Sequence, residues 1–96
     1  MRGGWVYIMT NKPNGVLYIG VTADLIARVN GHRERRGAAF VRRYNLTRLV
    51  YCEDYPTISE AIAREKAMKE WRRAWKVQLI EAQNPGWDDL WERINA

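Results

Sequence analysis

Two runs of strand-forming residues lie on either side of a strong turn signal near the start of the chain. The runs, 5–10 and 16–21, are rich in β-branched and aromatic side chains. The segment between them, 11–15, reads Asn-Lys-Pro-Asn-Gly and contains the residues that most favour turns. This arrangement predicts a β-hairpin. If the loop takes up the four residues before the glycine, Tyr7 opposes Tyr18 in the register of the two strands.

The expected hairpin has two different faces, because alternate side chains of paired strands lie on the same side of a sheet. One face is aliphatic and is expected to pack in the core. The other carries Tyr7 and Tyr18, with Gly20 leaving space beside the two phenols. The aliphatic residues are Val6, Ile8, Leu17 and Ile19.

The remainder of the chain predicts helices and one more strand. Thr57 and Glu60 form a capping-box pattern, which is typical of a helix start. The Asn-Pro-Gly sequence from Asn84 ends or bends the helix that follows. The elements expected after the hairpin are a helix over about 22–35, a short helix over 38–44, a strand over 47–53, a helix from 57 to just before 84, and a short helix over 87–94.

The length and the small number of metal-binding side chains limit the architecture. A chain of 96 residues is typical of one domain, expected here over residues 1–96. A single cysteine, Cys52, excludes an intrachain disulfide, and together with the single histidine, His32, it excludes the usual zinc sites of several Cys and His. No apolar run approaches the ~18 residues of a membrane span. We therefore expect a small soluble cytoplasmic domain.

Basic residues are concentrated in the middle of the chain, whose formal net charge is +5. Residues 28–48 contain seven arginines and one acid, whereas residues 77–96 contain four acids and one arginine. Clustered arginines suit bidentate contacts with phosphate, so we expect a nucleic acid as partner, although a basic soluble surface has the same composition. The expected nucleic-acid contacts are Arg33, Arg35, Arg36, Arg42 and Arg43.

Glu65 interrupts the apolar stripe of the helix expected after Thr57. It lies four residues after Ala61 and three before Met68, on the side that should face the core. An ionised carboxylate in such a position is costly unless it is paired or coordinates a metal. Glu65 is therefore a candidate metal ligand, and an internal salt bridge to an arginine is the structural alternative.

Arg28 and His32 lie one helical turn apart, so their side chains reach the same region. A lone histidine beside an apolar stripe is more often a packing residue than a catalyst. Tyr7 and Tyr18 can likewise be ordinary strand aromatics. However, the phenols, the Arg/His pair and Glu65 all come from elements that can pack around one sheet. Their expected proximity favours a catalytic site.

The spacing of these residues resembles that of the GIY-YIG nuclease family. Trp5-Val6-Tyr7 matches the first half of its motif, with Trp and Val in place of Gly and Ile. After ten residues, Tyr18-Ile19-Gly20 matches the second half, and Val21 stands where some relatives carry lysine. The resemblance covers almost the whole chain and is strongest to small single-domain bacterial members. The later matching positions are Arg28, His32, Glu65 and Asn84.

The resemblance implies an α+β fold, a three-stranded antiparallel sheet flanked by helices, and metal-dependent hydrolysis of DNA phosphodiester bonds. Glu65 would hold one Mg²⁺ or Mn²⁺ ion. Tyr18 would take the proton of the attacking water, and His32 would accept or relay it. The remaining roles implied are a phosphate clamp for Arg28, the positioning of water or phosphate for Tyr7, and holding the site together for Asn84.

One small domain leaves little surface for reading bases, and phosphate contacts carry no sequence information. We therefore expect low sequence specificity, with selectivity supplied by DNA structure or by a protein partner, as in DNA repair. Two alternatives remain open. The first is a non-catalytic nucleic-acid-binding module that keeps the fold. The second is a protein-interaction domain that uses Trp87 and Trp91, which requires both rings to be exposed.

Overall fold

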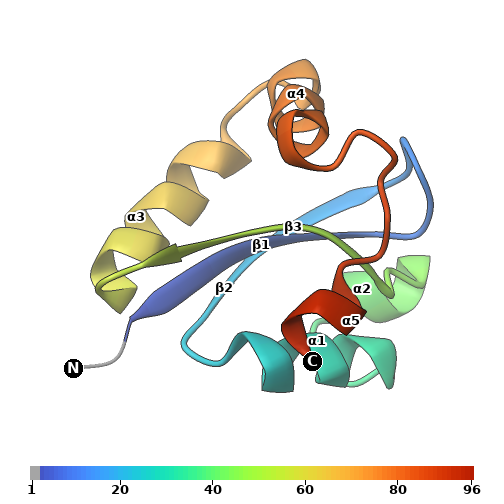
Figure 1. The fold of residues 1–96 in the computed structure, drawn as a ribbon, viewed down its shortest axis with the longest axis horizontal. Coiled ribbons are helices and arrows are strands. Elements are labelled where there is room, and N and C mark those ends of the chain that lie inside the picture. The colour runs from blue at the N-terminus through green and yellow to red at the C-terminus, as the bar shows by residue number, and fades with distance from the viewer. Residues whose placement is uncertain (1–2) are drawn as a thin grey trace.

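The computed structural model describes residues 3–96 and contains one three-stranded antiparallel sheet with the strand order β2-β1-β3. Figure 1 shows the sheet between two groups of helices, which confirms the expected α+β architecture. The strands are β1 (Gly4–Thr10), β2 (Leu17–Thr22) and β3 (Arg48–Tyr55). The helices are α1 (Leu25–Arg33), α2 (Ala39–Tyr44), α3 (Ile58–Lys69), α4 (Arg73–Gln83) and α5 (Trp91–Ile94).

The expected hairpin is present, but its register differs by two residues from the expected one. Tyr7 pairs with Gly20, and Tyr18 pairs with Met9, so the expected pairing of Tyr7 with Tyr18 was wrong. The reason lies in the loop, where the Asn11 side chain accepts a hydrogen bond from the Val16 amide at 3.1 Å. This bond keeps Val16 in the loop. Because a shift of two preserves the alternation of side chains, both faces are as expected.

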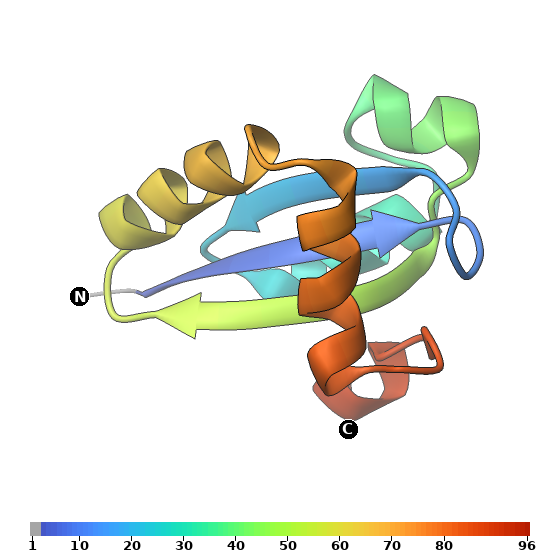
Figure 2. The ribbon, with the colours of Figure 1, turned by 90° about the horizontal axis from the view of Figure 1, so that it is seen from above.

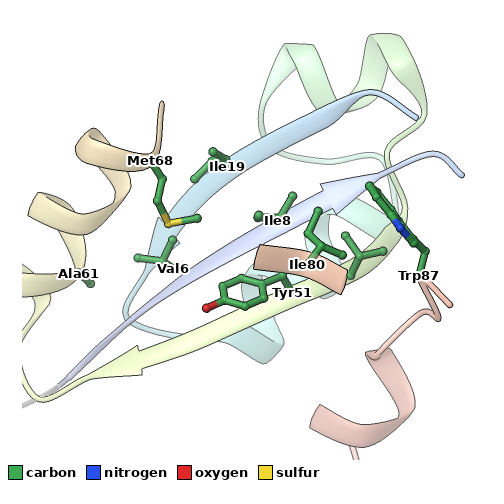
Figure 3. Packing of buried hydrophobic residues seen from close by; sticks show 9 residues of the cluster. Val6, Ile8, Ile19, Tyr51, Ala61, Met68, Ile80 and Trp87 are labelled. Atoms are coloured by element: carbon green, nitrogen blue, oxygen red, sulfur yellow. The ribbon is translucent and has the colours of Figure 1, made fainter. Parts of the chain in front are cut away.

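Both faces of the sheet are covered, each by its own hydrophobic cluster. On the first face, Val6, Ile8 and Ile19 pack against residues of α3, α4 and the segment after α4. Figure 3 shows Met68 and Ile80 directed from these helices toward the strands. On the second face, residues of β1 pack against α1 and α2. The main members of this second cluster are Tyr7, Met9, Leu25, Val29, Val41, Leu46 and Leu49.

The long helix expected from 57 to just before 84 is divided into α3 and α4, so this expectation was wrong in its second half. Thr57 caps α3 as expected, because its side chain accepts from the Glu60 amide. The break falls at 70–72, where Arg72 takes an extended conformation. It lets α4 cross above the strands in a new direction (Figure 2), which brings Ile80 into the first cluster. Neither glycine nor proline marks this break.

The other helices are shorter than expected at their ends. The first helix, α1, begins after Asp24, whose side chain accepts from the Ala27 amide, and it stops before Arg35, which has a φ of 61°. The last helix, α5, spans only Trp91–Ile94. Trp87 has a φ of 56° and cannot continue a helix. No helix within residues 3–96 combines the length and apolar character needed to cross a bilayer.

Trp87 lies in the first hydrophobic cluster and is 2% exposed. Trp91 is half-buried against the second cluster. The segment between these two residues contacts the start of β3, where the Leu90 amide donates a hydrogen bond to the Leu49 carbonyl at 2.8 Å. The interaction-domain alternative required both rings to be exposed, and it is therefore not supported.

Candidate active site

A buried hydrogen bond between Tyr7 and His32 lies at the centre of the candidate site. The Tyr7 hydroxyl and His32 Nε2 are 2.8 Å apart, and neither residue has more than 1% of its surface exposed. Tyr7 comes from the central strand β1, and His32 comes from the last turn of α1. The 4-then-3 spacing of Leu25, Val29 and His32 turns the imidazole toward the sheet together with the apolar side chains.

Gly20 makes room for the Tyr7 ring. A methyl group added at residue 20 would lie 2.4 Å from the Tyr7 hydroxyl oxygen, which is too close for any real contact. The space expected beside Gly20 is therefore filled by the phenol of Tyr7. A residue without a side chain on β2 allows the large ring of its cross-strand partner to pack closely over the β2 backbone at this position.

Tyr18 lies beside this pair and is half-buried, whereas Tyr7 has no exposed surface. The Tyr18 ring centroid is 6.3 Å from that of Tyr7 and 5.7 Å from that of His32. On its other side, Tyr18 stacks on Phe40 of α2 at 6.2 Å. Sequence reasoning missed Phe40, because only the tertiary packing of α2 brings it to β2. Of the two phenols, only Tyr18 can meet a molecule from solvent.

Arg28 is exposed on α1, one turn before His32, and its charge acts on both members of the buried pair. Burial lowers the pKa of His32, and the nearby Arg28 guanidinium lowers it further. Burial also raises the pKa of Tyr7 well above the ordinary range, an effect strengthened by Tyr18 and partly opposed by Arg28. At neutral pH the imidazole is therefore uncharged and can accept a proton, while Tyr7 keeps its own.

His32 has one ring nitrogen without a partner. Its Nδ1 atom is buried and has no hydrogen bond to any part of the chain that the structure describes. Gly37, which has a φ of 94°, lies next to this atom: a methyl group added there would be 3.5 Å from Nδ1. A buried polar atom without a partner is costly, and such atoms are often found where a site exchanges protons or binds water.

Glu65 lies on α3, which packs over β1 and β2 on the opposite side of the sheet from α1. Its side chain is 12% exposed, and Oε2 is paired with Lys69 Nζ at 2.8 Å. The expected alternative, a salt bridge to an arginine, is therefore wrong, because the partner is a lysine one turn along. Within residues 3–96, Glu65 forms no hydrogen bond or ion pair with Tyr18, Arg28 or His32.

The chemistry of Glu65 is compatible with one hard divalent cation. No cluster of three or more His, Cys, Asp or Glu side chains able to hold a metal occurs in the described part of the chain. A site here would thus rest on a single carboxylate, with the other positions taken by water and phosphate oxygens. This is the kind of ligand set that Mg²⁺ uses in enzymes acting on phosphates.

The structure places Asn84 apart from the aromatic cluster. Its side-chain amide donates to the main-chain carbonyls of Val50 and Asp88, at 3.1 and 2.9 Å, and its Oδ1 accepts from the Asp88 amide at 3.0 Å. These bonds fasten the turn after α4 onto β3. Asn84 therefore holds the fold of the C-terminal segment, and its contacts are with main-chain groups rather than with the tyrosines.

The arginines expected to contact nucleic acid fall into two groups. Arg33 donates to Asp89 at 2.8 Å, and its guanidinium lies 5.0 Å from the centre of the Trp91 ring, so it joins α1 to the C-terminal segment. The other four are exposed on α2 and on the loop before it. These are Arg35, Arg36, Arg42 and Arg43.

A second polar cluster lies on the α3 side of the sheet, around Glu53. The Glu53 carboxylate accepts from Arg64 at 2.7 Å and from the hydroxyls of Tyr51 and Tyr55. Burial acts to raise the pKa of Glu53, but these three donors outweigh it and hold the pKa below its ordinary value. A carboxylate whose two oxygens are both satisfied in this way serves the fold rather than a ligand.

Known proteins resemble this chain over most of its length. Residues 3–78 match the model of the GIY-YIG catalytic domain. UPF0213 proteins of several Staphylococcus aureus strains are 38% identical over 81 residues, which cover 84% of this chain and 98% of theirs. The solution NMR structure of a UPF0213 protein from Bacillus halodurans superposes with a TM-score of 0.57 at 29% identity, over 91% of this chain and 92% of that one.

Proposed function

This chain belongs to the GIY-YIG family, and on that basis we propose that it is a divalent-metal-dependent endonuclease that hydrolyses DNA phosphodiester bonds. The observation that carries the proposal is the hydrogen bond between Tyr7 and His32, which lies next to the accessible Tyr18 and Arg28. All four residues stand at positions of the family motif, and together they can move a proton beside a bound phosphate.

The proton pathway begins at Tyr18, since it is the phenol that solvent can reach. A free phenol has a pKa of about 10, so it cannot remove a proton from water at neutral pH without a second acceptor. We assign that acceptor to His32, reached through Tyr7: Tyr18 takes the proton of the attacking water, its own proton passes to the Tyr7 oxygen, and the Tyr7 proton passes to His32 Nε2. The uncharged imidazole can receive it.

Arg28 is the candidate phosphate clamp. It is exposed, lies one helical turn from His32, and forms no ion pair within residues 3–96. A guanidinium free of a carboxylate can make two parallel hydrogen bonds to a phosphate and offset charge that develops in the transition state. Tyr7 has no exposed surface and is therefore assigned to the proton pathway rather than to contact with water or phosphate.

Glu65 is the residue that would hold the metal ion. A bound Mg²⁺ or Mn²⁺ would neutralise charge on the phosphate and stabilise the leaving oxygen. Glu65 and the aromatic cluster lie on opposite sides of the sheet, and β2 is its edge strand. A DNA strand bound across the β2 edge could therefore meet both sets of residues. On this support we infer that the scissile phosphate binds at the β2 edge.

The proposed substrate is DNA, cut with low intrinsic sequence specificity. The exposed arginines around α2 suit the phosphate backbone, and backbone contacts carry no base information. Selectivity would then come from DNA structure or from a protein partner, such as one acting in repair. A non-catalytic nucleic-acid-binding module is the second candidate function. It is favoured by one observation, namely that the Glu65 carboxylate is already paired with Lys69.

A metal titration separates the two candidate functions. The purified chain is incubated with nicked, branched and single-stranded DNA while Mg²⁺ or Mn²⁺ is raised, and the same is done for Glu65→Gln. The nuclease proposal expects metal-dependent cleavage that falls by a factor on the order of 10² or more in Glu65→Gln. Lys69→Ala is the matched control, because it removes the ion pair but keeps the carboxylate. Equal inactivity of the wild type and Glu65→Gln on all three substrates would favour the binding module.

A further inference from the structure

A pocket of about 360 Å³ opens beside Arg28, along α1 and the loop that follows it. It lies on the outer side of α1, away from the apolar stripe that packs on the sheet. The residues that line it and matter here are Thr22, Asp24, Arg28, Gly31, Arg36 and Gly37. A cavity of this volume can accept a phosphate group together with part of the attached sugar.

Gly31 is the unexplained residue of this pocket. It lies inside α1, where glycine is a poorer helix former than any residue except proline. A methyl group added to it would meet no atom of another part of the protein within 4 Å. Its φ is not in the left-handed region either. The protein's own packing and backbone therefore give no reason for glycine at this position, whereas Gly20 and Gly37 each have one.

The charges around the pocket favour an anion. Arg28 has no ion pair in the described residues, and the Arg36 pair with Glu34 is formed by two well-exposed side chains, so it is easily exchanged for another partner. The one carboxylate in the wall is that of Asp24. It caps α1 by accepting from the Ala27 amide at 3.1 Å, which directs its charge to the start of the helix. Two guanidinium groups thus remain available to a ligand.

The pocket adjoins the candidate active site. Arg28 belongs to both, and Gly37 in the pocket wall lies directly beside His32 Nδ1. A polyanion whose one phosphate is held at Arg28 would therefore extend its next phosphate along the outer side of α1. Because phosphates on one DNA strand follow each other at regular short intervals, a second phosphate site in this direction suits a continuous strand.

We propose that the pocket over Gly31 is a second phosphate-binding subsite, in which Arg36 holds the DNA phosphate next to the scissile one, while Arg28 holds the scissile phosphate at the boundary between the pocket and the candidate active site. Residue 31 is glycine so that the backbone of the strand can approach the helix closely. This inference rests on the proposed function for its ligand class. It adds to that function a binding site of its own, with the strand running along α1 toward Arg36.

The test measures DNA binding without cleavage. Fluorescently labelled DNA is titrated with the full chain in EDTA, and affinity is followed by anisotropy at several salt concentrations, alongside the melting temperature. The variants are Gly31→Ala, Gly31→Met and Arg36→Gln. Asn30→Ala is the matched control, since it also improves helix propensity in α1 but lies outside the pocket.

Opposite changes in stability and affinity are the expected result. Both Gly31 variants should raise the melting temperature by about 2–6 °C, because they remove a helix-interior glycine. Gly31→Met should weaken DNA binding on the order of tenfold, with a smaller loss for Gly31→Ala. Arg36→Gln should reduce the slope of log affinity against log salt by about 0.7–0.9, the loss of one phosphate contact. Asn30→Ala should keep the wild-type affinity and salt slope.

Wild-type affinity in Gly31→Met would overturn the subsite. If Gly31→Met lowers the melting temperature instead of raising it, its loss of affinity could reflect poor folding. The test then rests on Arg36→Gln, and a slope of log affinity against log salt equal to that of the wild type overturns the subsite. Because no metal is present, these outcomes do not depend on cleavage. A protein that shows the expected binding changes but never cuts DNA contradicts only the proposed nuclease activity. A protein that cuts DNA, but whose Gly31→Met variant binds DNA with the wild-type affinity, contradicts only the subsite.

Discussion

Gly20 and Tyr7 face each other across β1 and β2 so closely that a methyl group at residue 20 would lie 2.4 Å from the Tyr7 hydroxyl oxygen. In this chain, the glycine that ends the second half of the family motif, Gly20, is thus required by Tyr7, the tyrosine that ends the first half. The two halves of the motif are joined by direct contact within the sheet, and His32 of α1 fixes the position of the phenol from the other side.

Gly20→Ala should displace the Tyr7 ring and weaken its hydrogen bond to His32. Overpacking of this kind costs about 1–3 kcal/mol of the free energy of unfolding. Urea denaturation followed by tryptophan fluorescence measures the loss. The double variant Gly20→Ala/Tyr7→Phe is the control, because a missing hydroxyl relieves part of the clash. A double variant as unstable as the sum of the two single variants would contradict the direct contact.

Tyr7→Phe and Tyr18→Phe should separate stability from activity. Tyr7→Phe leaves His32 Nε2 buried without a partner and should cost about 1–3 kcal/mol of folding stability. Tyr18→Phe, at a half-buried position, should change stability by less than about 0.5 kcal/mol. Under the proposed proton pathway, both should slow cleavage on the order of 10²-fold or more. Full activity of a folded Tyr18→Phe would remove Tyr18 from that pathway.

Folding stability should fall as the pH drops below about 6.5, the ordinary pKa of histidine. Burial and Arg28 lower the pKa of His32 in the folded state, so the unfolded chain binds a proton first as the pH decreases. Protons then favour the unfolded state, and the stability contributed by the neutral imidazole is lost between pH 6.5 and the lower folded pKa. Denaturation curves from pH 8 to 5 measure this loss. His32→Gln should show a flatter profile, and an identical profile would contradict a lowered His32 pKa.

Asn84→Ala should destabilise the fold without changing the chemistry. The variant loses three hydrogen bonds, and the Val50 and Asp88 main-chain groups lose their partner. The expected cost is about 1–3 kcal/mol of the free energy of unfolding. Cleavage by the folded fraction, measured at low temperature, should stay within about threefold of the wild type. A large loss of rate in a fully folded Asn84→Ala would place Asn84 in the active site after all.

The parts of the fold that depend on local periodicity could be predicted from the sequence. Alternation in the first two strands predicted both faces of the sheet, and helical spacing placed Arg28 and His32 on neighbouring turns. The register could not be predicted, because it depends on the Asn11 side chain bonding within the loop. The break after α3 could not be predicted either, because no glycine or proline marks it. It allows Ile80 to pack in the first hydrophobic cluster.

The candidate site was predictable only in part, because several of its contacts join segments that are far apart in the sequence. The hydrogen bond between Tyr7 and His32 depends on the packing of α1 on the sheet, and the two-residue shift in register places Tyr7 opposite Gly20, which leaves room for the ring. Phe40 joins the cluster through the packing of a separate helix onto β2. Glu65 is paired with Lys69 one turn along its own helix, and not with the arginine that was expected. The first two contacts are set by tertiary structure, whereas the Glu65–Lys69 pair follows from i,i+4 spacing within one helix.

The segment that matches the family model ends at residue 78, yet the first hydrophobic cluster is completed beyond it by Ile80 and Trp87. The same stretch supplies Asn84, which fastens it to β3. A fragment trimmed to the matched segment would lose its largest buried ring and leave an apolar sheet face in contact with water. Shortened or fused forms designed from the motif alone should therefore misfold, and the smallest unit that folds includes the turn around Trp87.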